Sequence, residues 1–163
     1  MQSGVIEKHR KFYFIGIGGV SMSALAKYLL ACGCEVAGSD RAAGERTEEL
    51  SALGVAVSIG SNAGNPRLRA ADVVVYTSAV PEEDEELTAA RESGKTVWKR
   101  SELLKAVSDT FSHVVAVAGS HGKTTCTAMC AHILEAARVP FAAHIGGEDS
   151  ELGNFYMSGH DFF

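Results

Sequence analysis

A glycine-rich stretch near residue 120 combines residue types that bind phosphate groups. It runs Gly119-Ser120-His121-Gly122-Lys123-Thr124-Thr125, between an apolar run at 113–117 and a helix-like run at 126–138. In such a strand–turn–helix, backbone N–H groups at the helix start point at an anion, and the helix dipole favours negative charge. Lys123 adds a charge for the outer phosphates, and Thr124 offers a hydroxyl to a magnesium ion. The stretch therefore predicts a nucleoside triphosphate site.

The spacing of this stretch departs from the common phosphate-binding loop. That loop has a glycine five residues before its last glycine, and Val117 occupies the position here. The compressed pattern Gly-x-x-Gly-Lys-Thr-Thr is typical of a narrower group of proteins. His121 has two interpretations of similar weight: a residue that shapes the loop beside the phosphates, and a cap or packing group.

A second glycine-rich turn follows the first apolar run of the chain, Phe12 to Ile17. The turn reads Gly16-Ile17-Gly18-Gly19-Val20-Ser21, and apolar residues then recur at helical spacing up to Gly33. A short strand-like run, Glu35 to Gly38, comes next and ends at Ser39 and Asp40. This βαβ unit is typical of nucleotide-binding folds.

The first turn nearly matches Gly-x-Gly-x-x-Gly, with Ser21 in the third place. A third glycine lets helix and strand pack closely; serine can still fit, and its hydroxyl could cap the helix or bind a phosphate oxygen. Asp40 lies about where an acidic residue binds ribose hydroxyls. We expect a diphosphate-bearing ligand here, with a plain tight turn as the alternative. The spacing alone does not separate NAD from a uridine nucleotide.

The remaining residues up to 110 alternate strand-like and helix-like segments. We predict strands at 55–59, 71–76 and 96–98, and helices at 48–53, 82–93 and 102–108, with Thr47 and Ser101 as N-caps. Ligands in open α/β sheets lie outside the carboxyl ends of strands, so Ser78 and Ala79 are candidate contacts. Simple turn chemistry explains those two residues equally well. The pattern predicts an α/β fold with a Rossmann-like, parallel, five-stranded sheet.

From residue 111 the chain repeats the strand–turn–helix plan, and we place a domain boundary near 110. Another short strand is predicted at 141–145, and no periodicity is evident at 148–163. A unit this small cannot bury both faces of a sheet. We therefore expect 1–110 to be a substrate-binding domain, and 111–163 to be the truncated, incomplete start of a P-loop ATP-binding domain.

Composition and charge exclude several classes of protein. The 163 residues are 46% hydrophobic and 21% charged, which is typical of a globular chain, and the net charge of −5 argues against a nucleic-acid partner. No apolar run is long enough for a membrane span, and the polar N-terminus is unlike a secretory signal. Because the sequence carries no secretion signal, we expect a cytoplasmic protein whose four cysteines are reduced. The spacing of these cysteines does not suit a zinc site.

Four segments together resemble the Mur ligases. They are Phe14 to Ser23, Gly38 to Asp40, Tyr76 to Val80 and Gly119 to Thr125, and they occur in the family's order over nearly the whole chain. The compressed loop with His121 before Gly-Lys-Thr-Thr is the most specific of them, and Ile145-Gly146-Gly147 is similar as well. Two positions depart from the family: Ser21 stands where glycine is common, and Ser120 where threonine is common.

The resemblance implies an ATP-dependent carboxylate–amine ligase of peptidoglycan synthesis. It is closest to the members that join L-alanine to UDP-N-acetylmuramate. In that family the lactyl carboxylate attacks the γ-phosphate of ATP, and the alanine amine then displaces phosphate from the acyl phosphate. Phosphorylation supplies the leaving group that a carboxylate lacks, and Lys123 with Mg²⁺ would offset charge on the transferring group.

The resemblance also assigns the site residues. For ATP they are Gly119, Ser120, His121, Gly122, Lys123, Thr124 and Thr125, with Lys123 and Thr124 catalytic and Thr124 the Mg²⁺ ligand. For the UDP part of the substrate they are Gly18, Gly19, Val20, Ser21, Ser39, Asp40, Ser78 and Ala79. The family's other metal ligands and its C-terminal domain would lie beyond Phe163. We therefore expect this fragment to bind the UDP part weakly and to be inactive alone.

Three alternatives stay open from the sequence. A related ligase that joins a whole tripeptide to the same sugar nucleotide would look much the same here, because the domain that selects the amine is absent. An NAD-dependent oxidoreductase would use the first glycine turn, although Ser21 and the second loop argue against it. A non-catalytic substrate-docking module is the third reading.

Overall fold

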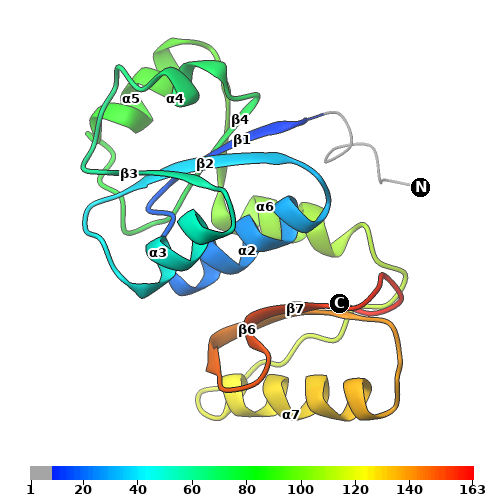
Figure 1. Ribbon diagram of the computed structural model, residues 1–163. Helices are drawn as coiled ribbons and strands as arrows, with labels where there is room; N and C mark the ends of the chain where they lie inside the picture. Colours follow the sequence, from blue (N-terminus) through cyan, green and yellow to red (C-terminus); the bar gives the residue numbers. More distant parts are fainter. Residues whose placement is uncertain (1–8) are drawn as a thin grey trace.

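The computed structural model describes residues 9–163, which form two units (Figure 1). The elements of the first unit are β1 (Lys11–Ile15), α2 (Val20–Ala31), β2 (Glu35–Asp40), α3 (Glu45–Ala52), β3 (Ala56–Ile59), α4 (Pro66–Ala70), β4 (Val73–Tyr76), α5 (Glu85–Glu92), β5 (Thr96–Lys99) and α6 (Arg100–Ser108). Those of the second are α7 (Lys123–Ala136), β6 (Ala142–Asp149) and β7 (Gly153–Met157). The two units meet at helix α2, which lies between the sheet of the first unit and the β6–β7 hairpin of the second (Figure 1).

The first unit is a five-stranded sheet in the order β3-β2-β1-β4-β5, with all neighbours parallel. This confirms the predicted α/β fold class. Helices α4 and α5 cover one face, and α2, α3 and α6 cover the other (Figure 1). Strands β1 and β4 lie in the middle, and β4 is buried at every position. Burial on both faces explains why these strands are continuous apolar runs rather than alternating ones.

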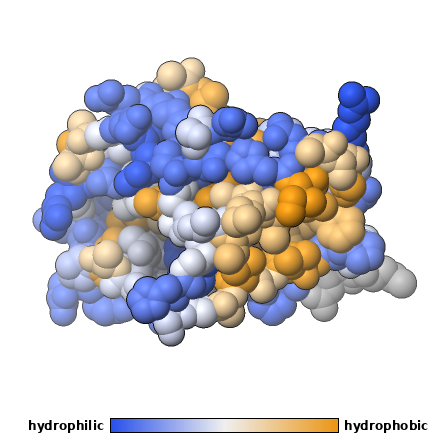
Figure 2. Space-filling model, turned by 90° about the horizontal axis from the view of Figure 1, so that it is seen from below, coloured by the Kyte–Doolittle hydropathy of each residue, from blue (hydrophilic) through white to orange (hydrophobic). Residues whose placement is uncertain are grey.

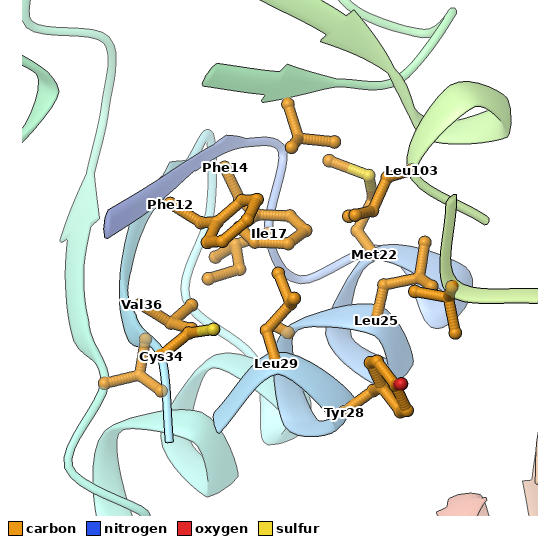
Figure 3. Packing of buried hydrophobic residues seen from close by; sticks show 14 of the residues in the cluster. Phe12, Phe14, Ile17, Met22, Leu25, Tyr28, Leu29, Cys34, Val36 and Leu103 are labelled. Atoms are coloured by element: carbon orange, nitrogen blue, oxygen red, sulfur yellow. The ribbon is translucent and has the colours of Figure 1, made fainter. Parts of the chain in front are cut away.

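Successive residues of β1 pack into the cores on opposite faces of the sheet. Phe12 and Phe14 point toward α2, where they meet Met22, Leu25 and Leu29 (Figure 3). Tyr13 and Ile15 point to the other face, in the cluster that α4 and α5 cover. This alternation follows from the period of two along a strand.

A buried carboxylate ties the α5 side of the sheet together. Glu86 is fully buried and accepts hydrogen bonds from the Tyr13 hydroxyl at 2.7 Å, from the Ser39 hydroxyl, and from the Asn62 N–H at 3.2 Å. Burial of the phenol, followed by its bond to Glu86, raises the pKa of Tyr13. Because a buried polar group is costly without partners, these bonds fix α5 and the 60–65 loop against β1 and β2.

Helix α2 is covered on its far side by the β6–β7 hairpin. Asn154 of β7 is fully buried; its Nδ2 donates to the Val20 carbonyl at 2.8 Å and to Ser23 Oγ at 2.7 Å, and its Oδ1 accepts from Lys27 Nζ at 2.8 Å. Lys27 also pairs with Glu49 of α3 at 2.6 Å. These bonds join the two units through one helix face.

A second polar contact lies at the start of α2. Ser21 Oγ lies 2.7 Å from His144 Nε2 of β6 and accepts a bond from Arg100 Nη1 at 3.0 Å. Since Arg100 can only donate, the Ser21 hydroxyl hydrogen is free to donate to a neutral His144 ring. Burial, followed by the nearby Arg100 charge, lowers the pKa of His144, in agreement with that neutral form.

The predicted strand at 113–117 is not formed in the described part of the chain. Its backbone partners there are Phe162 and Phe163, through a bridge at His113 and the bond from Val115 N–H to the Phe163 carbonyl at 2.8 Å. Val114 and Val115 are half exposed, at 51% and 57%. A strand needs a hydrogen-bonded neighbour along its length, and only its first residues have one.

Two N-cap predictions need correction, and two elements were not predicted. Gly44, not Thr47, is the N-cap of α3, because Thr47 lies in the first turn and its hydroxyl accepts from the Gly44 N–H at 2.8 Å. Lys99, not Ser101, is the N-cap of α6, since the helix begins at Arg100. Helix α4 and strand β7 were not predicted, since one is a single short turn and the other becomes a strand only by pairing with β6.

Figure 2 views the molecule from below, the side on which α7 lies in Figure 1, and shows apolar side chains gathered over part of this face. Met129 and Ile133 of α7 are 59% and 66% exposed. None of the helices within residues 9–163 combines the length and the apolar character that a membrane span requires.

Replacing Glu86 with alanine should lower the free energy of unfolding by about 2–4 kcal/mol, because two buried hydroxyl donors and one part-buried N–H lose their acceptor. Urea denaturation of Glu86→Ala measures this loss. Glu86→Gln keeps an acceptor oxygen and should lose less. The matched control is Glu85→Ala, an exposed neighbour, which should change stability by less than about 0.5 kcal/mol. Equal losses for Glu85 and Glu86 would contradict the assigned role.

Stability should fall as the pH drops below about 6.5, the ordinary pKa of histidine. The pKa of His144 is lowered in the folded state, so the unfolded chain takes up this proton at a higher pH. Protonation therefore stabilises the unfolded state relative to the folded one as the pH falls. His144→Gln should reduce this pH dependence, and Arg100→Gln, which leaves the burial, should reduce it only in part. Unfolding free energies measured between pH 8 and pH 5 test this; identical slopes in wild type and His144→Gln would refute it.

Candidate functional site

The first glycine turn lies where the sheet changes its winding direction. Strands β2 and β3 extend from one side of β1, and β4 and β5 from the other, so the carboxyl ends of β1 and β4 meet at a switch point. Ligands of open α/β sheets bind at such points. The loop after β4 reaches this place too, because a Cβ atom on Gly16 would lie 3.1 Å from Thr77 Cγ2. The structure thus brings the Gly16–Ser21 and Ser78–Ala79 predictions to one edge.

The turn is shaped by bonds from its own backbone. Gly16 has φ of 81°, a conformation that favours glycine, and the N–H groups of Gly16 and Ile17 both donate to the Ser39 carbonyl, at 2.8 and 2.9 Å. Gly18 N–H donates to Asp40 Oδ2 at 2.8 Å, and the Gly18 carbonyl accepts from Arg46 Nε at 2.7 Å. Asp40 therefore holds the turn itself.

The start of α2 leaves donors for an anion. The N-cap is Gly19, which has no side chain that could cap the helix. Within residues 9–163, the N–H groups of Val20, Ser21 and Met22 have no acceptor. Unpaired N–H groups at the start of a helix are suited to phosphate oxygens. The Ser21 side chain does not cap the helix, since it is bonded to Arg100 and His144.

The other residues predicted for the UDP part differ in what they expose. Ser39 is buried and its hydroxyl donates to Glu86, so its side chain is turned away from the turn. Ser78 and Ala79 are exposed, and the Ser78 hydroxyl has no hydrogen-bond partner among the described residues.

The second loop has the geometry of an open anion cradle. Gly119 has φ of 150° and Gly122, the N-cap of α7, has φ of 76°, both in the range that favours glycine. The N–H groups of Lys123, Thr124 and Thr125 have no acceptor in the described chain. The residues from Gly119 to Thr125 are exposed, so solvent and ligands can reach these donors.

Lys123 and Thr124 are the reactive side chains of this loop. Lys123 Nζ donates to the Gly119 carbonyl at 2.7 Å and to the Ser120 carbonyl at 3.3 Å, so it folds back over the loop. The Thr124 hydroxyl is unpaired within residues 9–163, and its methyl group packs under β6, where a Cβ on Gly147 would lie 2.8 Å from it. These residues fit a nucleotide with Mg²⁺: free N–H groups for phosphate, an ammonium for charge and a hydroxyl for the metal.

Residues near both turns line one cavity of about 690 Å³. It lies between α6, α7, β6 and the 114–117 segment, and Arg100, Lys123, Thr124 and His144 are among its lining residues. Arg100 and His144 also hold Ser21. The cavity therefore borders the second loop directly and is linked to the first turn through Arg100 and His144, which bond Ser21.

Sequence patterns alone do not indicate Arg46 and His144, two of the residues near these turns. Arg46 is a cation, but surface arginines are common and it lies in no motif. His144 falls within an apolar strand that carries no signal for function. Arg100 directly follows a predicted strand, and this position predicts either a residue facing the ligand cleft or a surface charge, with equal weight.

Comparison with known proteins identifies the family. The model of the Mur ligase family, catalytic domain, matches residues 11–112. A UDP-N-acetylmuramate–L-alanine ligase of Clostridium novyi is 40% identical over 158 residues, which cover 96% of this chain and 34% of that protein.

Solved structures agree with this assignment. The UDP-N-acetylmuramate-alanine ligase of Thermotoga maritima superimposes with a TM-score of 0.84 at 33% identity, over 93% of this chain and 36% of that one. The UDP-N-acetylmuramate:L-alanyl-gamma-D-glutamyl-meso-diaminopimelate ligase of Neisseria meningitides also gives 0.84, at 29% identity, over 94% and 51%. The chain spans about a third of the length of the curated relatives it matches. With its five parallel strands, its glycine turn at the switch point and this family match, the chain belongs to the Mur ligase family.

Proposed function

We propose that this chain carries the UDP-substrate and ATP sites of a ligase that joins L-alanine to the lactyl carboxylate of UDP-N-acetylmuramate. The observation that carries the proposal is a pair of helix starts, at Val20 and Lys123, whose N–H groups are free within residues 9–163. Each start follows a glycine turn, and relatives similar to this chain in sequence and fold are named for that reaction. The free donors suit two phosphate-bearing reagents.

The proposed division of labour follows the two units. Residues 1–110 would hold the UDP part, with Gly18, Gly19, Val20 and Ser21 at the diphosphate and Ser78 and Ala79 beside it. Asp40 and Ser39 act through the turn, since their side chains are bonded to Gly18 and Glu86. Residues 111–163 would begin the ATP-binding domain, with the loop from Gly119 to Thr125 around the phosphates.

The ATP and Mg²⁺ would supply phosphoryl transfer and charge neutralisation, which activate a carboxylate toward an amine. The residues of this chain bind and orient. Lys123 can leave the Gly119 and Ser120 carbonyls for a phosphate oxygen, because those bonds are exposed and exchange readily with water. Thr124 offers its unpaired hydroxyl to the metal. Positioning of this kind contributes most of the rate in phosphoryl transfer.

One related activity has support of its own. The Neisseria ligase named for a tripeptide substrate matches this structure with the same TM-score as the Thermotoga alanine ligase. The two proposals share the UDP and ATP sites and differ in the amine. This chain is 40% identical to the Clostridium novyi alanine ligase and 29% identical to the Neisseria tripeptide ligase, and the difference favours L-alanine.

Lys123→Ala should weaken binding of Mg-ATP at least tenfold and leave the affinity for UDP-N-acetylmuramate unchanged, because the ammonium is the loop's one charged side chain for phosphate. Isothermal titration of the 163-residue chain measures both. Lys99→Ala, which removes an exposed lysine of β5, is the control and should keep wild-type affinity for both ligands. Unchanged ATP binding in Lys123→Ala would refute the proposed ATP site.

Gly18→Ala should abolish stabilisation by UDP-N-acetylmuramate, since its Cβ would lie 2.9 Å from both Asp40 Oδ2 and Thr47 Cγ2 and would displace the turn. In wild type, ligand at about 100 times Kd should add about 2.7 kcal/mol, seen as a rise in Tm. Gly44→Ala is the matched control, because nothing lies within 4 Å of its Cβ and its φ is −172°. Stabilisation of wild type by NAD instead of the uridine nucleotide would overturn the assignment.

A further inference from the structure

We infer that strand β6 is a spacer that fixes the starts of α2 and α7 relative to each other, with His144 and Gly147 as its positioning residues. The inference rests on the proposed function, because it concerns how the two proposed phosphate sites are held in register. It assigns a role to a strand whose sequence carries no catalytic group.

One face of β6 contacts α2. His144 Nε2 lies 2.7 Å from the hydroxyl of Ser21, the second residue of that helix. Arg100 bonds the same hydroxyl at 3.0 Å, so the first turn of α2 is held from two directions. A movement of His144 would therefore move the first turn of α2, where the free N–H groups lie.

The opposite face of β6 contacts α7. Ala143 and Ile145 pack in one cluster with Ala131 of that helix. Gly147 continues this face and lies against Thr124, the second residue of α7; its Cβ, if present, would be 2.8 Å from Thr124 Cγ2. Nothing larger than glycine fits at 147 unless Thr124 shifts. The residue proposed to bind the metal is thus seated directly on the strand.

The strand is held on both sides of these contacts. It pairs with β7 from Ala142 to His144 and again at Asp149, with an irregular register between them. Asn154 of β7 is fully buried against α2 through bonds to Val20 and Ser23. His144 and Gly147 are three residues apart, which is at most roughly 10 Å along a strand. β6 therefore holds the second residues of both helices at a set separation.

This arrangement matters because the two reagents must meet in a fixed geometry. If each reagent is anchored at one helix start, the separation of the starts limits how closely the reacting groups approach, and a displacement of about 1 Å can cost about 100-fold in rate. A ligand that orders one helix start should also affect the other through β6. Such coupling commonly changes an affinity by about 5–150-fold.

Two measurements on the 163-residue chain test the spacer. The first is the affinity for UDP-N-acetylmuramate, by isothermal titration, without and with a saturating non-hydrolysable ATP analogue and Mg²⁺. In wild type the two affinities should differ by at least about fivefold. His144→Ala and Gly147→Ala should bring the ratio within twofold of one, and His144→Gln, whose amide oxygen can accept from Ser21, should restore it.

The control is Gly44→Ala, at the N-cap of α3. Nothing lies within 4 Å of its Cβ and its φ is −172°, so the wild-type ratio should persist. A wild-type chain that binds neither ligand would overturn the proposed function together with the spacer. A chain that binds both, with a ratio that His144→Ala and Gly147→Ala leave intact, would overturn the spacer alone.

The second measurement needs no ligand. In nitrogen-15 NMR spectra, His144→Ala should shift the backbone amide signal of Thr124, and Gly147→Ala should shift that of Ser21, each across the strand. Gly44→Ala should leave the Ser21 signal in place. Spectra in which each substitution perturbs only its own neighbours would contradict the spacer, whether or not either ligand binds.

Discussion

The burial of helix α2 is the constraint on which the rest of this structure depends. Its residues from Met22 to Leu29 are all buried, between the five-stranded sheet on one side and the β6–β7 hairpin on the other. Two of these buried residues, Ser23 and Lys27, are polar, and both form hydrogen bonds with Asn154 of the hairpin. A helix packed on both sides cannot shift alone, so its N-terminus, where we propose that a ligand binds, is held in a fixed position.

The polar groups around that fixed point divide into two kinds. One kind is fully paired: Ser39 with Glu86 and the turn, Asp40 with Gly18, and Asn154 with α2. The other kind consists of the N–H groups at the starts of α2 and α7, which have no acceptor within residues 9–163. Unpaired polar groups are costly when water cannot reach them, so the paired groups can be buried. The unpaired N–H groups at the start of α7 belong to exposed residues, and we propose that an anion satisfies those at the start of α2.

Much of the first unit follows from its sequence pattern. The apolar runs gave all five strands of the sheet, and the two glycine turns predicted where helices α2 and α7 begin. The pattern failed at 113–117, where an apolar run has partners only at its first residues, and at 153–157, where a strand exists only through pairing with β6. Both cases depend on contacts between distant segments, which local periodicity does not record.

For the proposed site, the sequence by itself determined the residue types: two glycine turns, a lysine and a threonine, each beside a helix start. Residue types and spacing suffice for that, because a turn and its helix are local structures. Only the tertiary structure decided that Ser39 faces Glu86, that Arg100 and His144 meet at Ser21, and that Gly147 seats Thr124. Those contacts join residues that are between 23 and 123 positions apart. They arise from the packing of α2 and β6, and no spacing along the chain encodes them.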